Sequence, residues 1–156
     1  MKISEFLCKE ALNSDLKATN KNEVIAEIVQ SLIDVGALEK KHKNKIIDVL
    51  LAREALGSTA IGQGIAIPHG KSDSTDKLVA ALAISKKGIN FDSLDGEPAH
   101  IFFLLVAPID SAGPHLKALA RVSRLLKDKF FRDSLKNTKT CKEMLELISR
   151  EDVRVG

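Results

Sequence analysis

Apolar residues between positions 20 and 36 recur at the spacing of one helix face. Pairs of them return every four positions and form a single stripe: Val24, Ile25, Ile28, Val29, Leu32 and Ile33. Asn20 or Asn22 can cap the first turn with its side chain, and Gly36 can end the helix. The pattern therefore predicts an amphipathic helix from Asn20 to Gly36.

A second helical pattern covers residues 43–56, where Ile46, Ile47, Leu50 and Leu51 face one side and Gly57 follows as a stop. The basic stretch KKHKNK, residues 40–45, lies between the two helices or opens the second. Nucleic-acid sites interleave aromatic residues for stacking or spread positive charge along a face. The sequence shows neither arrangement, so we expect this stretch, with His42, to be solvated and to bind no nucleic acid.

The middle of the chain changes to the pattern of strands. GIAIP (64–68) is short, whereas 77–85 and 100–108 are continuous apolar runs, which are typical of strands covered on both faces. Between them, residues 86–98 carry the Gly, Asp and Pro of turns. His100 opens the last run, and we expect it to be a strand-end residue rather than a ligand.

The last third of the chain returns to helix. Residues 113–128 predict a helix with Pro114 at its first position, where the missing N–H costs nothing. Two shorter helices are expected at 130–137 and 140–149. Strands that lie between helix pairs along the chain indicate an α/β sandwich.

Length and composition fit a single domain spanning residues 1–156. The chain is 44% hydrophobic and 29% charged, with a formal net charge of +3 that does not by itself indicate nucleic acid. No apolar run reaches the roughly 20 residues that span a bilayer, and the N-terminus does not read as a signal peptide. We therefore expect a cytoplasmic protein without membrane insertion, and reduced thiols at Cys8 and Cys141.

Several common motifs are absent. There is no P-loop, and the glycines of GQGIAIPHG do not open a helix as in a dinucleotide fingerprint. No His pair or Cys/His cluster has zinc spacing, and no serine stands in a G-x-S-x-G setting. The sequence therefore predicts neither a metal nor a cofactor.

His69 is the first candidate for chemistry. It follows the strand 64–68 in a glycine-edged turn, where Pro68 fixes the backbone and a ring nitrogen can be exposed. A neutral imidazole is a competent nucleophile toward phosphorus near pH 7. The alternative is a turn histidine that only hydrogen-bonds its neighbours.

His115 and Arg53 are the other two candidates. His115 falls in the first turn of a predicted helix, where free N–H groups and the helix dipole favour an anion, although it can also be a histidine that merely occupies a helix start. Arg53 can neutralise a phosphoryl group with paired N–H bonds, or it can pair with a carboxylate such as that of Glu54. From the residues alone, these alternatives stay open.

Three ordered blocks, REALGSTAIGQGIAIPHGK (53–71), FDSLDGEP (91–98) and GPHLKALARVSRLL (113–126), make the sequence resemble one known family over nearly its whole length. It is similar to the fructose/mannitol-type enzyme IIA domains of the bacterial phosphotransferase system. The resemblance implies a mixed β-sheet flanked by helices on both faces. It also implies that a histidine phosphocarrier protein donates a phosphoryl group, without metal or cofactor.

By the same resemblance, His69 is the phosphoryl acceptor, forming a tele-phosphohistidine, His115 its supporting histidine and Arg53 a phosphoryl stabiliser. The choice between the ring nitrogens of His69 depends on neighbours that the sequence does not place. Small and apolar groups near Ile67, Ala107 and residues 111–114 are expected to form the partner surface.

The branch of the family decides the onward partner. A free-standing chain that opens MKISEFL looks like the nitrogen-related regulatory branch, in which phosphorylation changes which target proteins are bound. The first alternative is a sugar-specific component that passes phosphate to an enzyme IIB. A further alternative is an interaction module that has kept the fold and lost the transfer.

Overall fold

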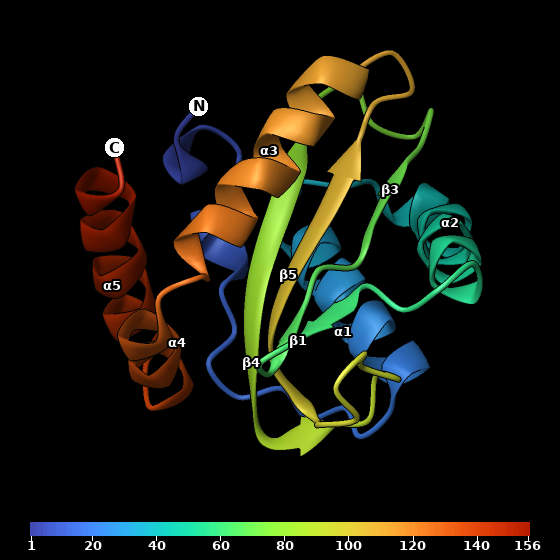
Figure 1. Ribbon diagram of the computed structural model, residues 1–156. Coiled ribbons are helices and arrows are strands. Elements are labelled where there is room, and N and C mark those ends of the chain that lie inside the picture. The colour runs from blue at the N-terminus through green and yellow to red at the C-terminus, as the bar shows by residue number, and fades with distance from the viewer.

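The computed structural model describes all 156 residues and shows a five-stranded sheet between two groups of helices (Figure 1). The helices are α1 (Lys21–Asp34), α2 (Lys43–Ala55), α3 (Ala112–Leu125), α4 (Lys129–Lys136) and α5 (Cys141–Arg154). The strands are β1 (Ala60–Gly62), β2 (Ile65–Ala66), β3 (His69–Lys71), β4 (Val79–Ile89) and β5 (Ala99–Ala107). Three short 3₁₀ turns are η1 (Ile3–Glu5), η2 (Lys9–Ala11) and η3 (Lys40–His42).

Strand β5 is the centre of the sheet. It pairs antiparallel with β4 on one side and parallel with both β2 and β3 on the other. The register of β2 and β3 against β5 is the same, since Ile65 lies opposite Ile101 and His69 opposite Leu105. The two short strands are therefore one extended segment, interrupted at residues 67 and 68, and β1 pairs antiparallel with β2 at its outer edge.

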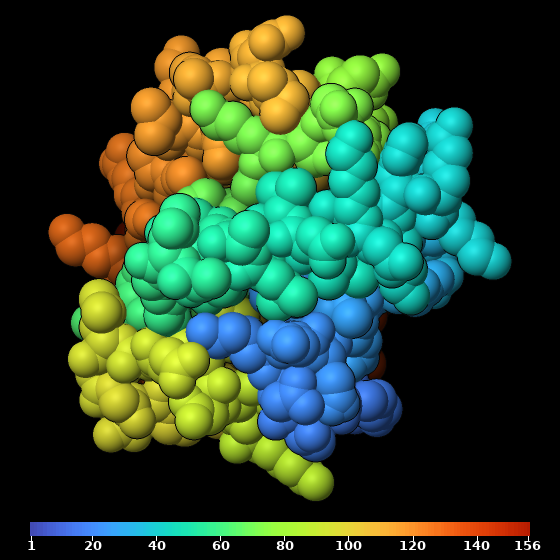
Figure 2. All heavy atoms as spheres, turned by 90° about the vertical axis from the view of Figure 1, so that its right-hand side faces the viewer, coloured from blue at the N-terminus to red at the C-terminus, as the bar shows by residue number.

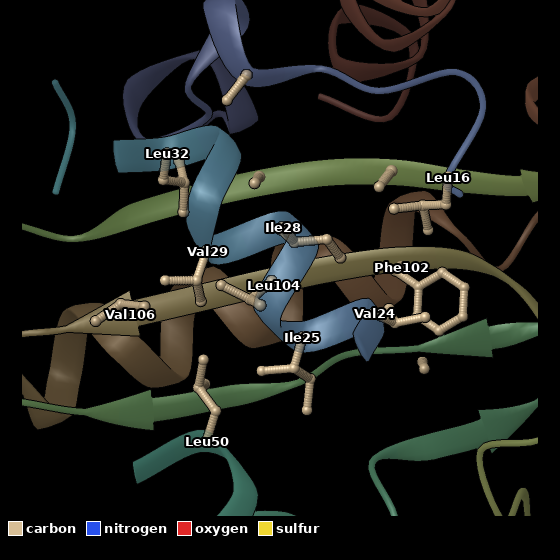
Figure 3. Close-up of a cluster of buried hydrophobic side chains, with 14 of the residues drawn as sticks. Leu16, Val24, Ile25, Ile28, Val29, Leu32, Leu50, Phe102, Leu104 and Val106 are labelled. Atoms are coloured by element: carbon tan, nitrogen blue, oxygen red, sulfur yellow. The ribbon is translucent and has the colours of Figure 1, made fainter. Parts of the chain in front are cut away.

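Side chains of the two long strands alternate between two cores. From β5, Phe102, Leu104 and Val106 pack with α1 and α2, as Figure 3 shows for part of this cluster. Their neighbours on β5 pack on the opposite face with α3, α4 and α5: Ile101, Phe103 and Leu105. Because a strand sends successive side chains to opposite faces, continuous apolar runs supply both cores. The predicted mixed sheet with helices on both faces is confirmed.

Several predicted boundaries shift in the structure. The predicted turn over 86–98 is partly wrong, because β4 continues to Ile89 through a register shift. Helix α3 begins at Ala112, so Pro114 is its third residue rather than its first, and α5 extends to Arg154. Helix α1 agrees closely with the prediction, and Asn20 caps it by accepting a hydrogen bond from the N–H of Glu23 at 2.9 Å.

The first 19 residues, for which the pattern predicted no element, run along β4. Isolated parallel bridges join Leu7 to Ala80 and Asn13 to Ala83. The chain end is also held to α5, where the Asp152 carboxylate accepts the N–H groups of Ile3 and Ser4. Cys8 and Cys141 are free thiols, as expected. None of the helices is both long enough and apolar enough to cross a membrane.

Candidate functional site

His69 is the first residue of β3 and not a turn residue, which corrects the prediction from sequence. Opposite it on β5 lies Leu105, whose side chain belongs to the core beneath α3. Residues in register on neighbouring strands point to the same face, so the His69 side chain leaves the sheet toward α3. It is half-buried, which leaves part of the ring accessible at the carboxyl end of the sheet.

A backbone carbonyl orients the His69 ring. Nδ1 of His69 lies 2.7 Å from the carbonyl oxygen of Ile67. A carbonyl oxygen only accepts hydrogen bonds, so in the neutral ring Nδ1 carries the proton. Nε2 then keeps the lone pair that a nucleophile needs. The short interruption between β2 and β3 therefore fixes the tautomer of the ring as well as its position.

His115 meets His69 from helix α3. The two ring centroids are 5.6 Å apart and the ring planes cross at 70°, so one ring presents its edge to the other. His115 is only 6% exposed, and its Nε2 is buried without a hydrogen-bond partner. Burial, then the charges of His69 and Lys71, lower the pKa of His115 below its usual value. The ring is therefore neutral near pH 7 and has an unused polar atom.

The start of helix α3 adds unpaired donors close to His115. Its N-cap residue, Ser111, makes no capping bond, because its hydroxyl donates to the carbonyl of Pro108 at 2.6 Å. The N–H of His115 bonds to the carbonyl of Ser111, while the N–H groups of Ala112 and Gly113 precede the first helical bond. Such a helix start favours a negatively charged group.

Arg53 does not join the two histidines. It lies in the last turn of α2, partly buried, and its Nη1 donates to the carbonyl of Gly57 at 2.7 Å. It makes no hydrogen bond or ion pair with either ring. Its neighbour Glu54 bonds to Thr59 instead, so the suggested pairing of Arg53 with that carboxylate is also absent. Arg53 remains a candidate whose donors can turn toward the site only if its side chain moves.

The expected partner surface is partly wrong. Ile67 is 5% exposed and Ala107 fully buried, so neither is available to a docking protein. The segment 112–114 is exposed as expected, and it is flanked by two apolar side chains in solvent, Ile109 and Leu116. Sequence patterns could not distinguish the buried residues from the exposed ones, because the burial of Ile67 and Ala107 depends on tertiary packing that a short window does not contain.

The site contains no group of three His, Cys, Asp or Glu side chains that could hold a metal ion. His42 lies in η3, and residues 43–45 open α2, so the basic stretch is both a connection and a helix start. His100 is the second residue of β5, and its Nδ1 lies 2.9 Å from the carbonyl of Ser85. These two histidines therefore do not take part in the His69–His115 pair.

An α/β sandwich with a histidine pair at the carboxyl end of its sheet is the class of protein that fold and site define. Residues 5–151 match the model of the family described as the phosphoenolpyruvate-dependent sugar phosphotransferase system, EIIA 2. The chain belongs to this family, whose members transfer phosphoryl groups through a histidine.

Two curated relatives represent two branches of the family. The nitrogen regulatory protein of Bradyrhizobium diazoefficiens is 34% identical over 149 residues, which cover 96% of this chain and 95% of that protein. The fructose-specific EIIABC component of Bacillus subtilis is 36% identical over 152 residues, which cover 97% of this chain but 24% of that protein. The match to the nitrogen regulatory protein thus extends over nearly the full length of both chains.

Solved structures agree on the fold. The nitrogen regulatory protein IIA-Ntr from Neisseria meningitidis superposes with a TM-score of 0.84 at 29% identity, covering 94% of this chain and 98% of that one. The mannitol enzyme IIA of Escherichia coli, solved in complex with phosphorylated mannitol enzyme IIB, gives a TM-score of 0.75 at 24% identity. It covers 90% of this chain and 95% of that one.

Proposed function

We propose that this chain, acting as one domain, accepts a phosphoryl group on His69 from a histidine phosphocarrier protein. The observation that carries the proposal is the geometry of the histidine pair. One ring has its Nδ1 held by a carbonyl and its Nε2 free, and the other is a buried neutral ring 5.6 Å away. A nucleophile with a fixed orientation beside an unpaired ring nitrogen suits phosphoryl transfer, which depends on positioning and on stabilisation of charge.

The transfer can be written with balanced atoms. Nε2 of His69 contributes its electron pair to a new bond with phosphorus, and the bond between phosphorus and the donor's ring nitrogen breaks. Its electron pair returns to the donor ring, while the Nδ1 proton of His69 stays hydrogen-bonded to Ile67. Because one imidazole replaces another, the exchange is nearly balanced, and the protein's task is to position the group and stabilise its charge.

His115 supports the transferred group in this proposal. An unpaired buried polar atom costs free energy, and a phosphoryl oxygen near the Nε2 of His115 would satisfy it. The low pKa of His115 keeps its ring neutral, so it supplies one N–H donor without placing a second positive charge beside His69. Arg53 takes the less central role of a cation that can approach from α2.

We propose a regulatory output for the phosphorylated form, through target proteins whose binding depends on phosphorylation. The match over 95% of a nitrogen regulatory protein supports this output. The second candidate, passage of the group to an enzyme IIB, is favoured by the 36% identity to a fructose-specific component and by the complex that the mannitol enzyme IIA forms. Both outputs use the same phosphorylated histidine.

The test begins with phosphoenolpyruvate, enzyme I and the phosphocarriers of the source organism. We expect acid-labile, alkali-stable phosphate on the chain, lost in His69→Ala. Failure of every phosphocarrier to transfer would contradict the proposal. To separate the outputs, the gene is deleted: loss of uptake of one hexose or hexitol indicates a sugar-specific component, whereas unchanged uptake with altered nitrogen-dependent regulation indicates the regulatory branch.

A further inference from the structure

Lys71 is an exposed lysine two residues after His69 on strand β3. Side chains at positions i and i+2 of a strand leave the same face, about 6.6 Å apart along the chain. The residue between them shows the alternation directly: a Cβ on Gly70 would lie 2.8 Å from Cγ1 of Val49 in α2, on the opposite face. His69 and Lys71 therefore both project toward the face that α3 covers.

The Lys71 ammonium has no partner in the protein. It makes no ion pair and no side-chain hydrogen bond, whereas nearby Lys45 of α2 is paired with Asp73 at 2.5 Å. Its charge nevertheless acts on the site, because it is one of the causes, after burial and His69, of the lowered pKa of His115. An unpaired cation thus lies within electrostatic reach of the histidine pair.

We propose that Lys71 binds the phosphoryl group carried by His69. This inference rests on the proposed function and deepens it, because it names a residue that the family resemblance did not supply. A lysine ammonium is a compact charge with three donors on a flexible stem, so it can follow the group from the donor ring to Nε2 of His69. It keeps its proton throughout and neutralises charge on the non-bridging oxygens.

The position of Lys71 also gives the site a cation that does not depend on contact between Arg53 and the phosphoryl group. Arg53 lies on the α2 side and donates to Gly57. Lys71 leaves the strand on the α3 side, where the unpaired Nε2 of His115 and the start of α3 also lie. The phosphoryl group would then meet a charged donor and a neutral donor from two different elements.

The decisive experiment separates phosphoryl binding from docking of the donor protein. The full chain and its Lys71→Gln and Lys71→Arg variants are phosphorylated with phosphoramidate, a small donor that needs no protein surface, and with the phosphocarrier. The control is Lys87→Gln. Lys87 is another exposed strand lysine, but it lies near the C-terminal end of β4, whereas the start of β4 at Val79 is the end level with β3. We expect Lys71→Gln to slow both reactions about tenfold, Lys71→Arg to retain most of the rate, and Lys87→Gln to match the wild type.

Each other outcome has a definite meaning. If the wild type is phosphorylated on His69 and Lys71→Gln reacts equally fast with phosphoramidate, the role of Lys71 is refuted while the proposed function stands. Slowing with the phosphocarrier alone would also refute it, since Lys71 would then contact the donor protein. As an independent readout, NMR titration should show a higher pKa for His115 in Lys71→Gln than in the wild type, and an unchanged pKa would count against the inference.

Discussion

Nδ1 of His69 lies 2.7 Å from the carbonyl oxygen of Ile67, the last residue before the proline that interrupts the edge of the sheet. This contact makes the backbone, rather than another side chain, the group that selects the tautomer. We predict that nitrogen-15 NMR of the unmodified protein at pH 8 shows a protonated Nδ1 and an unprotonated Nε2 for His69. The reverse assignment would show that the carbonyl does not orient the ring in solution.

His115 should matter for rate more than for the site of modification. In the proposed function, replacing it by alanine removes one donor to the transferred group, and loss of one such donor typically costs on the order of a hundredfold in rate. We expect His115→Ala to slow transfer by about that factor while His69 is still modified. The matched control is His42→Ala, because His42 lies in η3 outside the histidine pair; equal rates for the two variants would exclude the supporting role.

The lowered pKa of His115 also predicts a pH dependence of stability. Since the folded protein binds a proton on this ring less readily than the unfolded chain, its free energy of unfolding falls as the pH drops below about 6.5. The loss levels off once the pH is below the folded-state pKa. Denaturant unfolding between pH 7.5 and 5 should show a smaller fall in His115→Gln than in the wild type, and identical slopes would contradict the prediction.

The ion pair between Arg121 and Asp152 ties the helix of His115 to the C-terminal helix. Both side chains are 7% exposed, and Nη2 of Arg121 lies 2.6 Å from Oδ1 of Asp152. Burial alone would raise the pKa of Asp152, but the hydrogen bonds from Arg121, Ile3 and Ser4 outweigh it and hold the pKa below its usual value. The pair therefore loses its contribution only at acid pH, as the carboxylate is protonated.

We predict that Asp152→Ala lowers the free energy of unfolding by about 3–5 kcal/mol, because it leaves the Arg121 guanidinium buried without its partner. The double variant Arg121→Met/Asp152→Leu should recover much of that loss. Equilibrium denaturation with urea measures both. A loss near zero in Asp152→Ala would show that water reaches the guanidinium and that the pair contributes little.

The longer helices and strands could be predicted because each leaves a recognisable hydrophobic pattern in the sequence. The i, i+1, i+4, i+5 pairs of α1 mark one helix face, and the short apolar run of β5, followed by Pro108, favours a buried strand. The first 19 residues could not be predicted, because they are held by isolated bridges to Ala80 and Ala83 and by the carboxylate of Asp152 rather than by a local repeat. Long-range bonds of this kind leave no periodic signal.

The functional site, too, could be predicted only in part from the sequence. His69 and His115 stand in recognisable settings, but a three-residue strand such as β3 is too short for periodicity to reveal. Had His69–Lys71 been recognised as a strand, the two-residue spacing would have placed Lys71 beside His69. The prediction of the partner surface was partly wrong for a related reason. Ile67 and Ala107 are buried by tertiary packing, which a short stretch of sequence does not reveal.

The most direct test of the account is phosphorus-31 NMR of protein with nitrogen-15 histidine after transfer from a phosphocarrier of the source organism. We predict one phosphohistidine resonance, coupled to Nε2 of His69, absent from His69→Ala and present in His115→Ala. A resonance that persists in His69→Ala, or phosphorus attached to Nδ1, would contradict the claim that this ring accepts the group in the orientation set by Ile67.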